Sequence, residues 1–141
     1  MKQLFILLVL LVTGSLAATA QHLFISNKTD CVITMSVRSH VADEGCAVNQ
    51  SYDYDFPPGQ DLDLPTSAWP TGYPGGAPSS GQIWDSIKFY VHGDDGICGD
   101  EIGNPDCGFE DKWESGDCTC IGKTVHAEWS YSGSNIIAVF Y

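Results

Sequence analysis

The sequence predicts an all-β fold, a single antiparallel β-sandwich of about seven short strands stapled by disulfide bonds. Apolar and polar residues alternate with a period of two in several segments, which is typical of strands with one buried face. Gly and Pro separate these segments at close intervals, and no segment has the spacing of an amphipathic helix. Six cysteines, an even number, indicate three disulfide bonds in an oxidising compartment.

The first 20 residues are predicted to be a signal peptide. Lys2 gives a positive start, residues 4–12 are apolar, and small residues precede a cleavage point after Ala20. The apolar run is shorter than the roughly 20 residues that a membrane-spanning helix needs. We therefore expect a secreted, extracellular protein with one domain, residues 21–141.

The charge of the chain limits its partners. Residues 21–141 carry all 18 acidic residues against five Lys or Arg, a net charge of −13. Phosphate contacts need a basic surface, so nucleic acid is excluded as a partner, and no membrane insertion is expected. The negative charge can serve solubility alone, or it can attract a cationic partner or a divalent cation.

Each predicted strand rests on its own alternation, and the clearest is residues 84–92, with Ile87, Phe89 and Val91 on one face. The full set comprises residues 23–26, 31–38, 52–56, 61–64, 84–92, 123–131 and 135–141. Two long segments lie between them.

The first segment, residues 65–82, holds four Pro and four Gly, and the second, residues 92–120, holds nine acidic residues and four cysteines. Neither has an apolar run long enough for a core strand. We expect both to be loops, the second held in shape by disulfide bonds.

The cysteine pairing is predicted from proximity in the chain. A Cys31–Cys46 bond would tie a loop to the start of its strand. Cys118 and Cys120 would point the same way on a strand, which favours a nested pair, Cys107–Cys118 and Cys98–Cys120. Six cysteines allow 15 pairings, and zinc ligation by these thiols is the alternative to oxidation.

The acidic segment also offers ligands for calcium. Calcium takes six to eight oxygen ligands from carboxylates and carbonyls on a backbone that is free to turn. The candidate ligands are Asp94, Asp95, Asp100 and Asp106. The spacing is not that of an EF-hand, and a solvated acidic loop is the alternative; no other cofactor is expected.

Three aromatic residues are not explained by strand alternation, namely Trp69 and Tyr73 in the Pro/Gly segment and Trp113 in the acidic one. Aromatic faces stack on the apolar faces of sugars, and carboxylates accept hydrogen bonds from sugar hydroxyls. These residues are therefore the candidate carbohydrate-binding set. The alternative is that Trp69 and Tyr73 pack down and pin their loop to the sandwich.

Catalytic signals are few, and we expect a protein that is not an enzyme. There is no Gly-x-Ser-x-Gly nucleophile turn and no glycine-rich phosphate loop before a helix. His92 and His126 lie on the polar faces of two predicted strands and would meet if those strands were neighbours. An N-terminal His22 that chelates copper is a further alternative.

Asn27 and Asn49 each begin an N-glycosylation sequon.

A short part of the chain resembles the thaumatin-like β-sandwiches. The matching residues are Leu23, Ile25, Asn27, Cys31, Thr34 and Met35, and a Gly116-Asp117-Cys118 triplet. The Asn-to-Cys spacing is longer than in that family, the cysteines are fewer, and no Trp follows Thr34. The resemblance implies a disulfide-stapled sandwich and carries over no functional residue.

These observations together predict a secreted lectin-like or carbohydrate-binding module that uses the Pro/Gly/aromatic loop and the acidic loop. The alternative is a secreted protein that binds other proteins, as an inhibitor or effector, and a small extracellular hydrolase is the third hypothesis.

Overall fold

The structure is a computed structural model that describes residues 21–41, 44–65 and 81–141. Its elements, in chain order, are β1 (Leu23–Asn27), β2 (Ile33–Val41), β3 (Asn49–Gln50), β4 (Tyr54–Phe56), β5 (Asp61–Leu64), β6 (Gln82–Gly93), β7 (Gly96–Gly103), the 3₁₀ turn η1 (Pro105–Cys107), β8 (Lys112–Cys120), β9 (Lys123–Ser132) and β10 (Asn135–Phe140). In these ranges no helix is long and apolar enough to cross a membrane. Residues 1–20, Trp69 and Tyr73 lie outside the described residues, and so do the predictions made for them.

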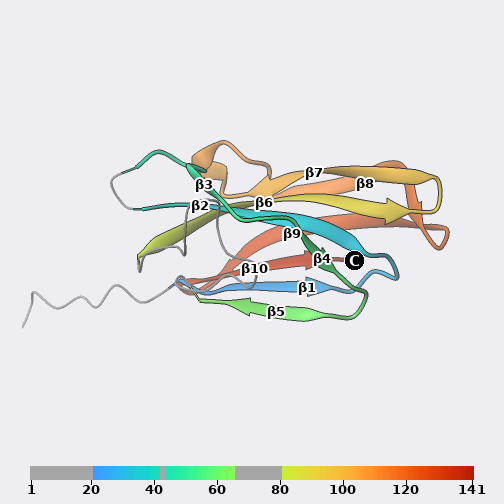
Figure 1. Cartoon of the computed structure of the whole chain (residues 1–141), viewed down its shortest axis with the longest axis horizontal. Coiled ribbons are helices and arrows are strands. Elements are labelled where there is room, and N and C mark those ends of the chain that lie inside the picture. The colour runs from blue at the N-terminus through green and yellow to red at the C-terminus, as the bar shows by residue number, and fades with distance from the viewer. Residues whose placement is uncertain (1–20, 42–43, 66–80) are drawn as a thin grey trace, which may run out of the picture.

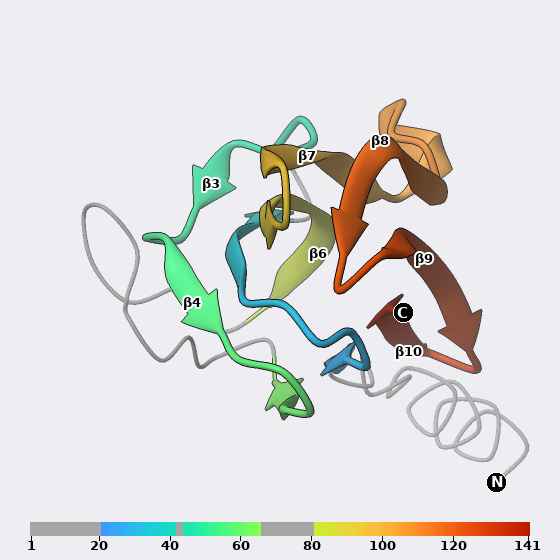
Figure 2. The same ribbon diagram turned by 90° about the vertical axis from the view of Figure 1, so that its right-hand side faces the viewer.

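The strands form two sheets that face each other, as predicted (Figures 1 and 2). Sheet A has the order β5-β1-β10-β9-β8, and sheet B has the order β3-β2-β6-β7 with β4 also paired to β2. Neighbouring strands are antiparallel except β1 and β10, which run parallel.

The core lies between the sheets and is built by the alternation seen in the sequence. Every second residue faces inward in β6 from Ile87 to Val91 and in β9 from Val125 to Trp129, so that Phe89 and Trp129 are buried. Phe89 packs edge-on against Phe140, with ring centroids 4.9 Å apart. Because each large apolar side chain that is buried contributes about 1.5–3 kcal/mol, this layer is the main source of stability.

The prediction that residues 92–120 form a loop is wrong, because most of them belong to β7 and β8. The two strands are the edge strands of their sheets, and they lie side by side where the sandwich closes (Figure 2). An edge strand has only one neighbour in its own sheet and is less covered than a central strand, so it can carry many polar residues. In β7 only Ile102 and Gly103 are buried, which is why no apolar run marks this strand.

All six cysteines are paired, but the three predicted pairs are wrong. The observed bonds are Cys31–Cys120, Cys46–Cys107 and Cys98–Cys118. Cys98 on β7 and Cys118 on β8 join the two sheets at the edge where they meet. The prediction assumed that cysteines close in sequence pair, whereas strand packing brings together residues that are 89 and 61 positions apart.

Candidate functional site

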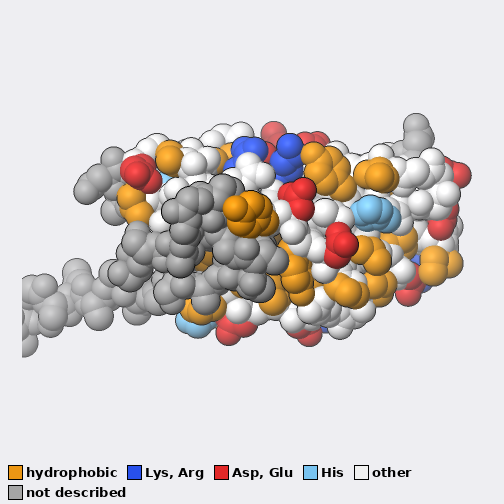
Figure 3. Space-filling view, viewed as in Figure 1, with side chains coloured by type: hydrophobic (Ala, Val, Ile, Leu, Met, Phe, Trp, Pro, Cys, Tyr) orange, Lys and Arg blue, Asp and Glu red, His pale blue; other side chains and the backbone are white. Residues whose placement is uncertain are grey.

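The outer surface of sheet A carries a row of exposed and half-buried apolar side chains between acidic ones. We define the sheet A face by its central residues and its flanking carboxylates: Phe24, Ile137, Val139 and Tyr141, with Asp61, Asp63, Glu114 and Glu128. Strand register sets the rows, since Phe24 lies opposite Ile137 on one side and Asp63 on the other. Phe24 is 37% exposed and Tyr141 51% exposed. Figure 3 shows another side of the molecule, where β4 of sheet B and the edge strand β5 lie, and hydrophobic and acidic side chains are mixed there too.

One end of the sheet A face is a groove of about 370 Å³ between β1, β5 and β10. The His22 ring stacks on Phe24 with a centroid distance of 5.7 Å, and its Nδ1 lies 2.8 Å from an Asp63 oxygen. The Ser26 hydroxyl donates to Asp61, and this hydrogen bond, with the nearby Lys28 ammonium, lowers the pKa of Asp61 below its ordinary value. The groove therefore presents an aromatic ring beside an ionised acceptor.

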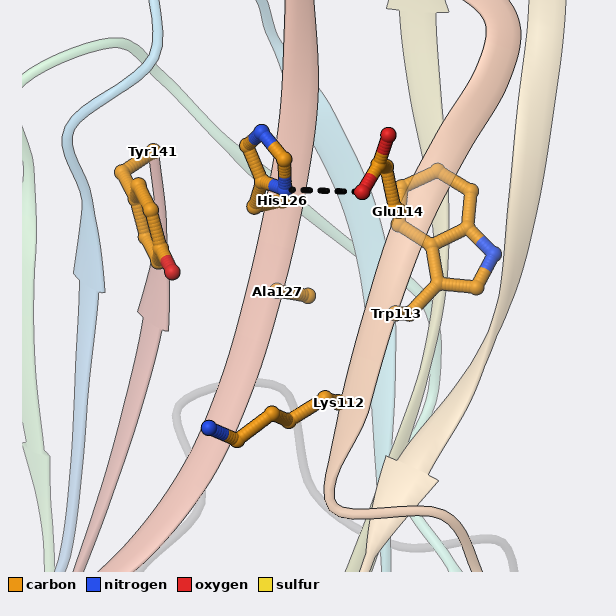
Figure 4. A pocket seen from close by; sticks show the side chains of 6 residues that line it. All are labelled: Lys112, Trp113, Glu114, His126, Ala127 and Tyr141. Carbon is orange, nitrogen blue, oxygen red and sulfur yellow. Dashed lines mark ion pairs between the residues drawn. The ribbon is translucent and has the colours of Figure 1, made fainter.

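The other end is a groove of about 270 Å³ between β8, β9 and the C-terminal residue (Figure 4). The rings of His126 and Tyr141 stack with centroids 5.3 Å apart, and two backbone hydrogen bonds between these residues keep them in register. Glu114 Oε2 lies 3.7 Å from His126 Nδ1 on the side away from Tyr141. Lys112 pairs with Glu128 at 3.4 Å. This groove again combines an exposed ring with carboxylates.

Trp113 does not join these rings, although the sequence placed it in an exposed binding set. Lys112 and Glu114 are exposed, whereas Trp113 between them is turned to the other side of β8 and is half-buried against the core. It packs edge-on against Phe89, with ring centroids 5.0 Å apart. In Figure 4 its indole points away from Tyr141. Trp113 is nevertheless among the residues that line this groove, so its place in the candidate binding set stays a prediction.

The four candidate calcium ligands are not brought together. Asp94 and Asp95 lie in the turn before β7, whereas Asp106 follows that strand, whose eight residues span about 25 Å. The carboxylate of Asp94 accepts the Gly122 N–H at 2.8 Å, and this bond lowers the pKa of Asp94. Asp94 thus ties the β6–β7 turn to the β8–β9 turn, and a calcium site shared by the four predicted residues is ruled out by this geometry.

His92 and His126 belong to different sheets, so the hypothesis that their rings meet is wrong. His92 Nε2 lies 2.8 Å from the Thr34 hydroxyl, which donates to Asp55 at 2.7 Å. This chain lies on sheet B, whereas His126 faces outward from sheet A.

Asn27, the first residue of one glycosylation sequon, is completely buried. Its side-chain amide donates to the carbonyls of Cys31 and Phe56, and its carbonyl accepts from Thr29. This asparagine shapes the β1–β2 loop and is closed to a glycosyl donor, whereas Asn49 is only half-buried.

A cluster that sequence reasoning missed lies around Asp85, which is fully buried in β6. Its two oxygens lie 2.7 and 2.9 Å from His40 Nδ1, and the Ala47 N–H donates to it at 2.7 Å. The sulfur of Cys107, bonded to Cys46, is 3.4 Å away. The sequence did offer a signal, because Asp85 lies inside the most regular predicted strand and a carboxylate that is buried there requires polar partners.

In comparisons with known proteins, no family model, no curated protein and no solved structure matches this chain. The short resemblance to thaumatin-like sandwiches gains no support from them. The function must therefore be argued from the residues themselves.

Proposed function

We propose that this protein is a secreted, non-catalytic, lectin-like module that binds a carbohydrate chain across the sheet A face. The observation that carries the proposal is the pair of stacked rings at the two ends of that face, each beside carboxylates. The pairs are His22 with Phe24, and His126 with Tyr141.

The two rings are spaced to contact a ligand longer than one sugar unit. Tyr141 directly follows β10 and comes four residues after Ile137, the neighbour of Phe24, a distance of about 13 Å along the chain. A ring that stands clear of the core offers a flat apolar face. The carboxylates of Asp61 and Glu114, on either side, can accept hydrogen bonds from sugar hydroxyls and fix the orientation of the ligand.

Two features support the proposed secreted location. A small all-β domain with three disulfide bonds is compatible with an oxidising extracellular environment. The sequence of residues 1–20 has the three parts of a signal peptide.

A protein partner is the second candidate, and one observation favours it. The centre of the sheet A face is aliphatic, formed by Ile137 and Val139, and acidic residues surround it. An apolar centre with a polar rim is the usual anatomy of a protein interface. The excess of carboxylates would select a cationic partner and make association faster at low salt.

Binding to a panel of insoluble and soluble polysaccharides tests the proposal. Tyr141→Ala and Phe24→Ala should each weaken binding at least about tenfold, because each removes one stacking ring. Tyr52→Ala is the matched control, since Tyr52 is 53% exposed and lies outside the face. Equal binding by all four proteins, or binding to cationic proteins alone, would reject the carbohydrate proposal; the second result would support the protein partner.

A further inference from the structure

Four side chains from separate parts of the chain meet at one end of sheet B. His40 comes from β2, Asp85 from β6, Cys46 from the segment before β3, and Cys107 from η1. One ligand-type atom from each of them lies within 4.8 Å of all the others. In the residues that the structure describes, this is the one such group of three or more.

The atoms of this group form the donor set of a structural zinc site. Zinc is held tetrahedrally by Cys sulfur, His nitrogen and Asp oxygen, and two thiolates with an imidazole and a carboxylate supply four ligands. In the oxidised protein the two sulfurs are bonded to each other, so neither is a thiolate and the set is incomplete.

We propose that reduction of the Cys46–Cys107 bond converts this cluster into a zinc site. An external dithiol supplies two electrons and two protons, the S–S bond breaks into two thiols, and the dithiol becomes a disulfide. Zinc then binds both sulfurs, and the two thiol protons leave to solvent. The disulfide and the metal are thus alternative ways to join the same two segments.

Accessibility favours this bond over the other two. An attacking thiolate must reach a disulfide sulfur, and Cys46 is solvent-exposed. Cys98 and Cys118 are half-buried, and Cys31 and Cys120 are only 8% and 2% exposed. Attack on Cys46 therefore releases Cys107, whose sulfur is beside the Asn104 side-chain amide at 3.7 Å.

The surroundings of the cluster favour a bound cation once the thiols are free. Asp85 is fully buried, and the Ala47 N–H at 2.7 Å fixes the orientation of its carboxylate. Two thiolates beside a buried carboxylate would be strongly repulsive with only one histidine to offset them. A divalent cation removes that repulsion, and backbone contacts of this kind orient ligands in metal sites.

Limited reduction of the intact secreted protein under native conditions is the first test. Free cysteines are blocked with an alkylating reagent in one aliquot and located by mass spectrometry. Cys46 and Cys107 should be modified before the other four. If either of the other two disulfide bonds is reduced first, the proposal is wrong.

Metal binding by the unblocked aliquot is the second test. Zinc binding is measured by competition with a chromogenic chelator, and cobalt(II) binding is measured by its sulfur-to-metal charge-transfer absorption. The reduced protein should bind one zinc ion per chain, and the oxidised protein should bind at least about a hundredfold more weakly. No difference between the two forms would contradict the inference.

Two variants identify the ligands. Asp85→Asn keeps an acceptor for the Ala47 N–H, and both it and His40→Asn should weaken zinc binding of the reduced form at least about tenfold. His126→Asn is the control, because His126 also contacts a carboxylate but lies on sheet A. If His40→Asn and His126→Asn bind equally well, zinc is held by cysteines of a loosened chain and the proposed site is wrong.

Discussion

Two histidine–carboxylate pairs in this protein have the same chemistry and opposite surroundings. His40 and Asp85 are 2.7 Å apart, with side chains 13% and 0% exposed. His126 and Glu114 are 3.7 Å apart, with side chains 38% and 68% exposed. The first pair is enclosed beside a disulfide bond, whereas the second borders an open groove.

The difference separates a structural pair from a pair that borders the binding surface we propose. Burial removes water from the first pair, so each member depends on the other and on the Ala47 N–H for its hydrogen bonds. The second pair keeps its water, contributes little to stability, and leaves its polar atoms free for a ligand. The following predictions test this division.

Asp85→Ala should have the largest effect on stability, lowering the free energy of unfolding by about 3–5 kcal/mol, since it leaves buried polar groups without partners. Glu114→Ala, the matched change in the exposed pair, should alter it by less than about 0.5 kcal/mol. Urea unfolding with the disulfides intact measures both. Similar losses of unfolding free energy in the two variants would show that the buried and the exposed pair do not differ in their contribution to stability.

Trp113→Ala should have the next largest effect, about 2–3 kcal/mol, because it opens a space beside Phe89. Polysaccharide binding by the folded protein should change less than in Tyr141→Ala, since the half-buried indole packs on Phe89 and points away from Tyr141. Loss of binding with no loss of stability would instead show that Trp113 belongs to the binding surface.

Asp94→Asn should give the smallest effect, a slightly lower stability near neutral pH that disappears in acid. Asp94 is exposed like Glu114, yet the Gly122 N–H holds its pKa below the ordinary value of 3.8. A carboxylate whose pKa is lowered by folding stabilises the native state above the unfolded pKa, and that contribution disappears as the pH falls through the folded pKa. The unfolding midpoint of the wild type should therefore fall more steeply below pH 3.8 than that of Asp94→Asn. Parallel curves would show that this hydrogen bond does not stabilise the fold.

The strands that have one face buried in the core were predicted well from the sequence. Ile87, Phe89 and Val91 alternate in β6 because each contacts the core, and the same holds for Val125 and its neighbours in β9. The prediction failed at β7 and β8, where the edge of a sheet is held by backbone hydrogen bonds that leave no pattern in the side chains. The treatment of Trp113 as a residue outside any strand followed directly from that failure.

What the sequence determined by itself is the all-β class, the alternating strands of the core and an even set of cysteines, since these depend on residue types and local spacing. Tertiary structure alone decided the pairing of the cysteines, the dispersal of the acidic residues and the meeting of His40 with Asp85. These depend on which strands become neighbours. Neighbours in a sandwich are selected by burial of the whole core, so segments far apart in the chain come together in ways that no local pattern encodes.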